Sequence, residues 1–170
     1  MRKAVFFDRD GVLNIDTDYL YRIEDFRWIE GAKEALSYLT KKGYLIFVVT
    51  NQSGVGRGYF TEADVNRLHA WMCREAKAAG GIITDVYYCP YIEGAKVKEY
   101  DKKSYWRKPE PGMVLAAAKD YDVDLSKSYM IGDRSRDVEC AENAGMQGYL
   151  FTGGRLDTFV QSIEEKRERS

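Results

Sequence analysis

Histidine is almost absent from the sequence, which has one, His69, among 170 residues. It lies in a helical pattern, far along the chain from the acidic motifs, and we expect a solvated or half-buried side chain with a structural role. A single histidine argues against a Ser-His-Asp triad and against a metal site with several histidine ligands. Acid–base chemistry in this chain would therefore fall to carboxylates or lysine.

Long apolar runs are missing as well. No segment approaches the about 20 residues that a membrane-spanning helix needs. The first residues turn acidic at Asp8, too early for a secretory signal, so the cytoplasm is the expected compartment. The three cysteines (Cys73, Cys89 and Cys140) have no CxxC spacing, which predicts reduced, structural thiols.

The sequence also lacks an excess of charge of either sign. Lys and Arg number 26 against 27 for Asp and Glu, which gives no general attraction to nucleic acid or to an anionic membrane. Any charge that binds phosphate must therefore be local. With 45% apolar and 31% charged residues, the composition is that of a globular protein, and the length fits a single domain over residues 1–170. We expect a monomer.

Short apolar runs alternate with helical patterns along the chain. Strands are predicted at 3–8, 45–50, 83–89, 128–132 and 147–151. Helices are predicted at 30–42, from 61 to 80, at 111–121, at 136–144, and from 156 into a tail that frays over 164–170. This alternation predicts right-handed crossovers and an α/β fold: a three-layer, Rossmann-like parallel sheet with helices on both faces.

Polar residues directly follow three of the predicted strands. The first strand ends in Asp8-Arg9-Asp10-Gly11, the second in Thr50-Asn51-Gln52-Ser53-Gly54 and the fourth in Gly132-Asp133-Arg134-Ser135-Arg136-Asp137, while Lys108 stands just before a helix start. Ligands of open parallel sheets bind beyond the carboxyl ends of the strands. Each motif alone is typical of a solvated turn, a helix cap or a charged bend. Together, and in this order, they predict one site.

The runs FFDRDGVLN, VVTNQSG, RKPEPGM and IGDRSRD are similar to the four motifs of the haloacid dehalogenase superfamily of phosphotransferases. The resemblance extends from residue 5 to residue 137, and it implies a magnesium-dependent phosphatase. A phosphomonoester dianion repels a carboxylate nucleophile. Magnesium, a hard cation that takes oxygen ligands, neutralises that repulsion.

The same resemblance implies roles for the two aspartates after the first strand. Asp8 matches the nucleophile that attacks phosphorus and forms an aspartyl-phosphate, with its second carboxylate oxygen on magnesium. Asp10 matches the general acid and base, and its backbone carbonyl is expected to bind magnesium too.

Four further positions match the superfamily pattern. Thr50 and Lys108 match the residues that hold the transferring phosphoryl oxygens. Asp133 matches the outer magnesium carboxylate, so Asp8, Asp10 and Asp133 form the expected metal set. Asp137 is expected to act through water or by orienting Lys108.

A finer resemblance joins the run 50–60 (TNQSGVGRGYF), the run 87–90 (YYCP) and the run 107–113 (RKPEPGM) to the D-glycero-D-manno-heptose 1,7-bisphosphate phosphatases and their histidinol-phosphatase relatives. It implies a sugar-phosphate substrate and a role in lipopolysaccharide or other glycoconjugate biosynthesis. No segment between the motifs has room for a separate cap domain. The implied substrate-binding residues are Asp16, Tyr19, Asn51, Gln52, Ser53 and Arg107. The guanidinium of Arg107 suits a second phosphate or vicinal oxygens.

One departure from these families concerns the loop before Arg107, where they carry a structural zinc held by a Cys-x-His and a Cys-x-Cys. Here only Cys89 is present, Tyr91 replaces the histidine, and Ser104-Tyr105-Trp106 replaces the second pair. Four zinc ligands cannot be assembled, so we predict no zinc. We expect aromatic residues to pack the loop instead: Tyr91, Tyr100, Tyr105 and Trp106.

Three alternatives to the heptose phosphatase are open. Histidinol phosphate carries a cationic amine that an acidic loop with Asp16 and Asp18 could serve. A polynucleotide-end phosphatase would prefer a basic face, but acidic residues interleave with the lysines of 96–108. A non-catalytic sugar-phosphate binder or scaffold would be expected to lose Asp8 or Asp10, and both are present.

Overall fold

The computed structural model describes all 170 residues, and its five strands form one parallel sheet in the order β3-β2-β1-β4-β5. The strands are β1 (Ala4–Phe7), β2 (Leu45–Asn51), β3 (Asp85–Cys89), β4 (Tyr129–Gly132) and β5 (Gln147–Leu150). The central strand β1 aligns Phe7 with Val48 of β2 on one side and with Ile131 of β4 on the other.

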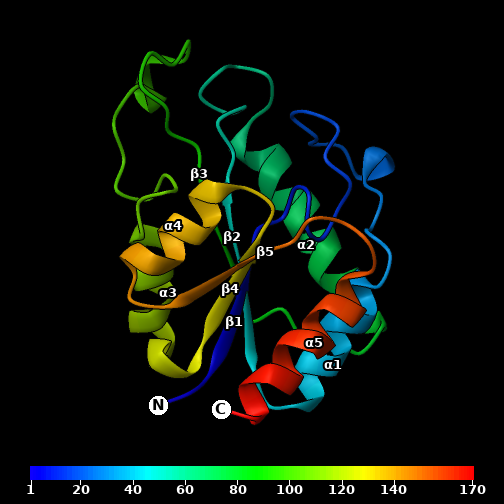
Figure 1. Cartoon of the computed structure of the whole chain (residues 1–170). Helices are drawn as coiled ribbons and strands as arrows, with labels where there is room; N and C mark the ends of the chain where they lie inside the picture. The colour runs from blue at the N-terminus through cyan, green and yellow to red at the C-terminus, as the bar shows by residue number, and fades with distance from the viewer.

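Helices cover both faces of this sheet (Figure 1). They are α1 (Ala32–Lys41), α2 (Glu62–Ala78), α3 (Gly112–Tyr121), α4 (Ser135–Asn143) and α5 (Leu156–Glu168), with short 3-10 turns at Ile23–Asp25, Lys98–Tyr100 and Leu125–Lys127. Helices α1, α2 and α5 pack on one face, and α3 and α4 pack on the other. The predicted three-layer, Rossmann-like fold is confirmed. No helix combines the length and the apolar character needed to cross a membrane.

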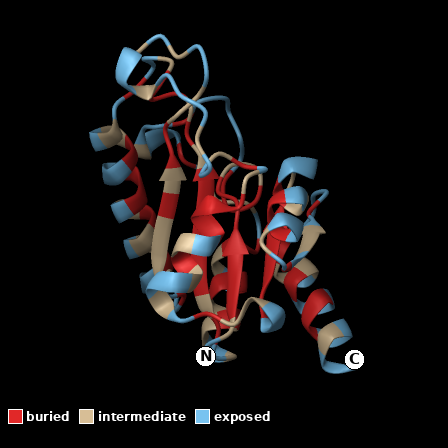
Figure 2. Cartoon of the chain, turned by 90° about the vertical axis from the view of Figure 1, so that its left-hand side faces the viewer, coloured by how far each residue is buried: buried red, intermediate tan, exposed pale blue.

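The core lies on both sides of the sheet because successive side chains of a strand point to opposite faces. In β1, Val5 and Phe7 belong to the cluster under α1, α2 and α5, whereas Ala4 and Phe6 belong to the cluster under α3 and α4. All four side chains are fully buried. Figure 2 shows the buried residues along the strands and the exposed ones on the outer helix surfaces and the loops.

Helix α2 starts where the sequence predicts, at a reciprocal capping box. The Asp64 amide donates to Thr61 Oγ1 at 3.2 Å, and the Thr61 amide donates to Asp64 Oδ2 at 2.9 Å. These bonds satisfy two of the amides that a helix start leaves without partners. Its apolar stripe then packs Val65, Leu68 and Met72 against the interior.

Most element ends differ from the predicted bounds by one or two residues; strand β3, for example, begins at Asp85 rather than at residue 83. The predicted fraying of the tail is wrong, because α5 continues to Glu168. The reason is Glu164, which is buried and accepts hydrogen bonds from the hydroxyls of Tyr44 and Tyr129, both at 2.9 Å. A charged residue thereby docks the last helix on the sheet.

The topology brings the ends of three central strands together. From β1 the chain proceeds outward to β2 and β3, then returns to β4 on the other side of β1. The change of direction opens a crevice at the carboxyl ends of β1 and β4. The long loops rise above this edge of the sheet, opposite the two chain termini (Figure 1).

Candidate active site

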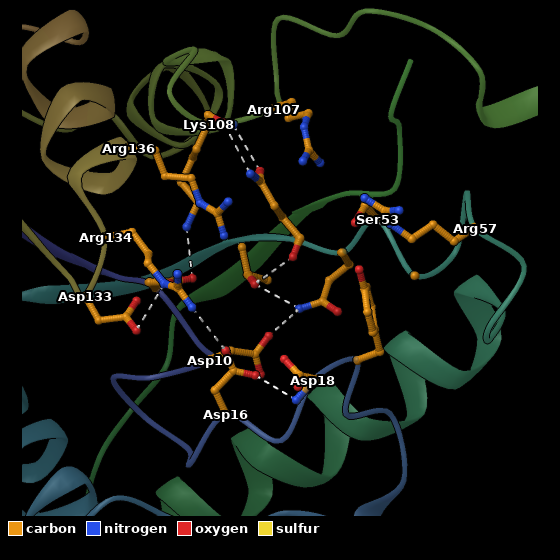
Figure 3. Close-up of a pocket in the computed structure, with 16 residues that line it drawn as sticks. Asp10, Asp16, Asp18, Ser53, Arg57, Arg107, Lys108, Asp133, Arg134 and Arg136 are labelled. Atoms are coloured by element: carbon orange, nitrogen blue, oxygen red, sulfur yellow. Dashed lines mark hydrogen bonds and ion pairs between the residues drawn. The ribbon is translucent and has the colours of Figure 1, made fainter. Parts of the chain in front are cut away.

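A polar pocket opens at this edge of the sheet, and the predicted site residues line it (Figure 3). Its lining comprises Asp8, Asp10, Asp16, Asp18, Tyr19, Thr50, Asn51, Gln52, Ser53, Gly54, Arg57, Arg107, Lys108, Asp133, Arg134 and Arg136. All ten residues predicted to bind or act on the substrate are in this set, together with Asp133, the predicted metal ligand. The motifs converge because the sheet is parallel and brings the carboxyl ends of its strands to one edge.

Asp8 lies at the bottom of the pocket, immediately after β1, and its side chain is buried. Its Oδ1 accepts hydrogen bonds from the amide of Arg9 and from Lys108 Nζ, both at 2.9 Å. Burial raises the pKa of Asp8 to about 7; the nearby Lys108 ammonium lowers it, and Asp137 raises it further. Because burial disfavours the charged carboxylate, additional positive charge is needed to keep this group ionised.

Lys108 is a buried cation that bridges two carboxylates. Its Nζ lies 2.9 Å from Asp8 Oδ1 and 2.7 Å from Asp137 Oδ1, and it also donates to the carbonyl of Val49. Burial lowers the pKa of Lys108, but Asp8 and Asp137 outweigh that effect and raise it above its usual value. Asn51 braces the Lys108 backbone: it accepts from the Lys108 amide and donates to the Lys108 carbonyl. The expectation that Asp137 orients Lys108 agrees with this contact.

Three carboxylates gather around this lysine. Oxygens of Asp8, Asp133 and Asp137 lie within 4.8 Å of one another, and Asp133 Oδ1 is buried with no hydrogen-bond partner. Burial raises the pKa of Asp133, as does the nearby Asp137. Lys108 is the one buried cation among them, and the exposed Arg134 approaches Asp133 only at 3.8 Å, so the ionised cluster carries more negative than positive charge. The geometry and the charge therefore fit a divalent cation with oxygen ligands.

The Asp10 side chain lies outside the three-carboxylate cluster. Its role in metal binding, which the sequence analysis assigns to the backbone carbonyl, stays a prediction. Oδ1 accepts from Arg9 Nε at 3.2 Å, Arg9 Nη2 at 2.9 Å and Asn14 Nδ2 at 3.0 Å, and Oδ2 accepts from Gln52 Nε2 at 3.2 Å. Burial raises the pKa of Asp10, but the Arg9 charge and these hydrogen bonds outweigh it and hold the pKa below its usual value.

Gln52, the first residue after β2, connects Thr50, which is predicted to bind the phosphoryl group, to Asp10. Gln52 Nε2 donates to Thr50 Oγ1 at 2.9 Å as well as to Asp10 Oδ2, and it is buried. Ser53 Oγ accepts from Arg57 Nε at 3.3 Å. The side-chain amides of Asn51 and Gln52, which are predicted to bind substrate, thus hydrogen-bond to neighbouring site residues. Their contact with substrate stays a prediction.

The loop with Asp16 and Tyr19, both predicted to bind substrate, forms the rim of the pocket. Asp18 and Tyr19 both have left-handed backbone conformations, with φ of 58° and 57°, and this conformation is strained for a tyrosine. Tyr19 is held by the edge of Tyr59 (ring centroids 4.8 Å apart) and by the guanidinium of Arg57, 5.7 Å from its ring. Asp16 reaches toward Arg134 across the pocket mouth, with 3.9 Å between Oδ2 and Nη2.

Three arginines of the pocket were missed by the sequence analysis: Arg57, Arg134 and Arg136. They surround the mouth together with Arg107, with Arg57 and Arg107 on one side and Arg134 and Arg136 on the other (Figure 3). Burial lowers the pKa of Arg107, and the charges of Arg136 and Arg57 lower it further, which indicates that the cations are close enough to repel one another. A signal for two of them was present in the sequence. Arg134 and Arg136 lie between Asp133 and Asp137, within the acidic motif that was assigned to the site.

The expected exposure of His69 also has to be corrected. It is 5% exposed, so the expected solvated or half-buried side chain is wrong. Its Nε2 lies 2.9 Å from Nη1 of Arg9, which is buried beside Asp8 and Asp10. Distance along the chain concealed this contact, because α2 packs across the sheet and returns His69 to the first motif.

The loop before Arg107 is packed by aromatic side chains, as expected for two of the four named residues. Tyr91 and Tyr100 contact each other with ring centroids 5.9 Å apart. Trp106 packs on Tyr87 at 5.8 Å but is 37% exposed, and Tyr105 is 58% exposed. All three cysteines are unpaired.

Tyrosine hydroxyls also tie this loop to α2. Tyr88 donates to Glu62 Oε1 and Tyr100 donates to Glu62 Oε2, each at 2.6 Å. We call these three residues the Glu62 clamp. It joins the end of β3, the middle of the loop and the first turn of α2.

Comparison with known proteins gives sequence relatives that cover nearly the whole chain. The protein-family model described as "HAD-hyrolase-like" matches residues 105–167. The D-glycero-beta-D-manno-heptose-1,7-bisphosphate 7-phosphatase of Rhodopseudomonas palustris is 42% identical over 169 residues, which is 99% of this chain and 94% of the relative. The enzyme of the same name from Haemophilus ducreyi is 48% identical over 148 residues, covering 86% and 80% of the two chains.

Two solved structures of heptose 1,7-bisphosphate phosphatases are similar to this chain. The D,D-heptose 1,7-bisphosphate phosphatase from B. bronchiseptica, complexed with magnesium and phosphate, superposes with a TM-score of 0.83 at 29% identity and covers 96% of this chain and 99% of its own. The phosphatase of the same substrate from Burkholderia thailandensis has a TM-score of 0.64 at 28% identity, with 95% and 85% covered.

Proposed function

The chain belongs to the D-glycero-D-manno-heptose-1,7-bisphosphate 7-phosphatases, a family of HAD-like phosphoric monoester hydrolases, and on this premise we propose that it removes the 7-phosphate of a heptose 1,7-bisphosphate. The observation that carries the proposal is the division of charge in the pocket. Buried carboxylates and Lys108 lie at the bottom, and four guanidinium groups surround the mouth. This arrangement suits a substrate with one phosphate at the bottom and another at the rim.

Magnesium is the cofactor that the bottom of the pocket fits. Asp8 and Asp133 would hold it through carboxylate oxygens, Asp10 through its backbone carbonyl, and Asp137 is close enough to contribute. The excess of negative charge in the cluster and the lack of a hydrogen-bond partner for Asp133 Oδ1 support this assignment. When bound, the ion supplies charge neutralisation between the phosphate dianion and the attacking carboxylate.

The first chemical step would use Asp8, Lys108 and Asp10. A carboxylate oxygen of Asp8 attacks phosphorus, while the Lys108 ammonium and the Thr50 hydroxyl stabilise the phosphoryl oxygens. The bond from phosphorus to the C7 oxygen breaks as the new bond forms. Asp10 gives a proton to the departing alkoxide, which is a poor leaving group without one. Such acid catalysis contributes roughly 10²–10⁴-fold.

The second step would reverse the role of Asp10. As a carboxylate, it takes a proton from the water that attacks the aspartyl-phosphate, and phosphate leaves with Asp8 restored. The low pKa of Asp10 suits this base function. For the first step, the incoming phosphate dianion raises the proton affinity of Asp10, because two like charges at short distance disfavour ionisation.

The charge of the rim favours a bisphosphate over histidinol phosphate. The amine of histidinol phosphate would meet Arg57, Arg107, Arg134 and Arg136, and repulsion between like charges disfavours that approach. The acidic pair Asp16 and Asp18 is the feature that supports the alternative, but Asp16 faces Arg134 across the mouth.

The absence of zinc is part of the proposal. The loop before Arg107 is held by aromatic contacts and the Glu62 clamp, which supply the order that a metal would give. Removing all metals with a chelator and then restoring magnesium alone is expected to return full activity.

The test is magnesium-dependent phosphate release from both anomers of heptose 1,7-bisphosphate, from histidinol phosphate and from a 3′-phosphorylated oligonucleotide. We expect a heptose bisphosphate to have the highest kcat/KM. A preference for histidinol phosphate would reject the substrate assignment while retaining the chemistry, and absence of turnover on the whole panel would reject the proposed function.

A further inference from the structure

Arg9 is a buried guanidinium whose side chain is 1% exposed, and each of its three nitrogens has a partner. Nε and Nη2 donate to Asp10 Oδ1, Nη2 also donates to the carbonyl of Leu20 at 3.1 Å, and Nη1 lies 2.9 Å from His69 Nε2. One side chain thus contacts the acid–base carboxylate, the loop next to Tyr19, and helix α2. Burying a charge so fully is costly unless its donors are satisfied.

The chemistry of this contact defines the state of His69. A guanidinium can only donate, so Nε2 must be the acceptor and the ring proton resides on Nδ1. Neutral histidine is consistent with the surroundings, because burial first and the Arg9 charge second lower the pKa of His69 to about 3. His69 is therefore a fixed acceptor that satisfies Nη1 of Arg9.

The hydrogen bonds divide the two oxygens of Asp10 between different tasks. Oδ1 receives three donors, two from Arg9 and one from Asn14. Oδ2 receives one, from Gln52. With Oδ1 saturated, Oδ2 is the oxygen with capacity left to hold and transfer a proton.

The anchor for this arrangement is α2, which contributes no residue to the pocket lining. The helix is held by its capping box and by the buried stripe of Val65, Leu68 and Met72. The His69 ring also packs against Tyr88, with centroids 6.0 Å apart. A rotamer locked by packing is the kind of support that keeps a reacting group within tenths of an ångström of its productive position.

We propose that Arg9 and His69 are a positioning pair for Asp10, in which His69 anchors the Arg9 guanidinium to α2 and Arg9 holds Oδ1 so that Oδ2 serves the leaving group. The inference rests on the proposed function, since it assigns a support to that reaction's acid and base. In the supported step, the bond from Asp8 to phosphorus forms, the bond from phosphorus to the leaving oxygen breaks, and the proton on Asp10 Oδ2 passes to that oxygen.

A positioning role and a merely structural one differ in their dependence on the leaving group. An alkoxide needs the proton from Asp10 as it departs, whereas p-nitrophenolate is a stable anion that leaves without one. The value of kcat/KM reports on this first step for both substrates. Displacing Asp10 should therefore harm the alkyl substrate selectively, whereas general loss of folded enzyme lowers both values equally.

The experiment compares kcat/KM for a primary alkyl phosphomonoester and for p-nitrophenyl phosphate at saturating magnesium in three variants. His69→Leu removes the acceptor, and we expect its loss on the alkyl substrate to be about tenfold larger than its loss on the aryl substrate. His69→Gln, whose amide oxygen can accept from Nη1, is expected to stay within about threefold of wild type on both. Met72→Ala, which creates a cavity beneath the same helix, controls for lost stability. It should leave the ratio of the two kcat/KM values unchanged.

Equal losses of His69→Leu on the two substrates, in protein that melts cooperatively, would overturn the proposal. So would a wild-type ratio in every variant. If wild-type protein releases no phosphate even when heptose 1,7-bisphosphate serves as the primary alkyl phosphomonoester, the proposed function itself fails, and this outcome is distinct from a change confined to the His69 variants.

Discussion

Asp8, Lys108 and Asp137 make a buried charged chain in which a cation lies between two carboxylates. Such a group is unfavourable in an apolar interior, and it persists because each charge has a close partner. The consequence for Asp8 is a pKa near neutrality until more positive charge arrives. At the residue scale, ionisation of Asp8 near neutral pH therefore depends on further positive charge, which the proposed magnesium would supply.

Replacing the nucleophile tests the central residue. Asp8→Asn keeps an oxygen that can accept from Lys108 and Arg9 but cannot form an acyl phosphate, so kcat should fall by at least about 10³-fold. Phosphate release should be measured beside thermal melting, which we expect to be retained. Turnover above about a hundredth of wild type would contradict the assignment of Asp8.

His69 makes stability sensitive to acid. Its pKa is about 3 in the folded protein and near its model value of 6.5 in the unfolded chain, so between these values the unfolded chain binds the extra proton. The contribution of His69 to the free energy of unfolding is therefore complete above pH 6.5. It is lost as the pH falls toward 3, by on the order of several kcal/mol.

Urea unfolding at several pH values checks this dependence. His69→Gln, which does not titrate, should show a smaller loss of unfolding free energy between pH 6.5 and the lowest pH at which both proteins fold. Equal slopes for the two proteins would show that His69 does not carry the effect.

At the element scale, the loop before Arg107 depends on α2. The Glu62 clamp joins it to the first turn of that helix, while Arg107 itself donates to the carbonyl of Tyr91 at 3.5 Å. The loop thus carries Arg107, which we propose binds substrate, on a segment whose only regular structure is the short turn Lys98–Tyr100. Its order has to come from side-chain contacts.

Removing the carboxylate of the clamp should loosen this loop. We expect Glu62→Ala to lower the free energy of unfolding by about 1–3 kcal/mol, because two tyrosine hydroxyls lose their acceptor. It should also raise KM for the bisphosphate more than it lowers kcat, since Arg107 loses its fixed position. Glu75→Ala, on the same helix and in a long contact of 3.8 Å with Lys33, is the matched control. Limited proteolysis within 90–107 that is no faster in Glu62→Ala than in this control would contradict the clamp.

At the scale of the whole molecule, the site joins the two halves of the sheet. Asp8 follows the central strand β1, Asp133 follows β4, and Lys108 enters from the connection between β3 and α3. Binding a cation among these residues stabilises the packed arrangement as a whole, because the unfolded chain cannot hold the ligands together.

Magnesium should therefore raise the melting temperature, and more at pH 8 than at pH 6. The sign follows from Asp8, whose pKa of about 7 leaves it mostly ionised at pH 8 and mostly protonated at pH 6, where a proton competes with the metal. At about a hundredfold excess over Kd, the stabilisation is about 2.7 kcal/mol. Differential scanning fluorimetry with and without magnesium measures the shift.

Two variants sharpen that measurement. Asp133→Asn should lose most of the shift, whereas Asp122→Asn should retain it. Asp122 is an exposed aspartate with a φ of 54°, a conformation that asparagine also tolerates. A shift independent of pH in wild type would contradict the role given to Asp8.

The sequence alone determined the architecture and predicted which residues form the chemical centre. Alternating apolar runs and helical patterns predicted the parallel sheet, since burial on both faces of a strand leaves a continuous apolar run such as AVFF. The motif residues Asp8, Asp10, Lys108 and Asp133 could be named because they stand in short contiguous runs. The ends of parallel strands then bring such runs to one edge.

Tertiary structure decided which distant side chains meet. The contact of His69 with Arg9 spans 60 positions, and those of Glu164 with Tyr44 and Tyr129 span 120 and 35. No local pattern marks such pairs, because a buried polar residue on a helix looks like a surface one until its partner is known. The four arginines around the pocket mouth and the docking of α5 could not be predicted for the same reason. Both depend on the angle and the register at which the elements pack, and the order of residues along the chain does not specify these.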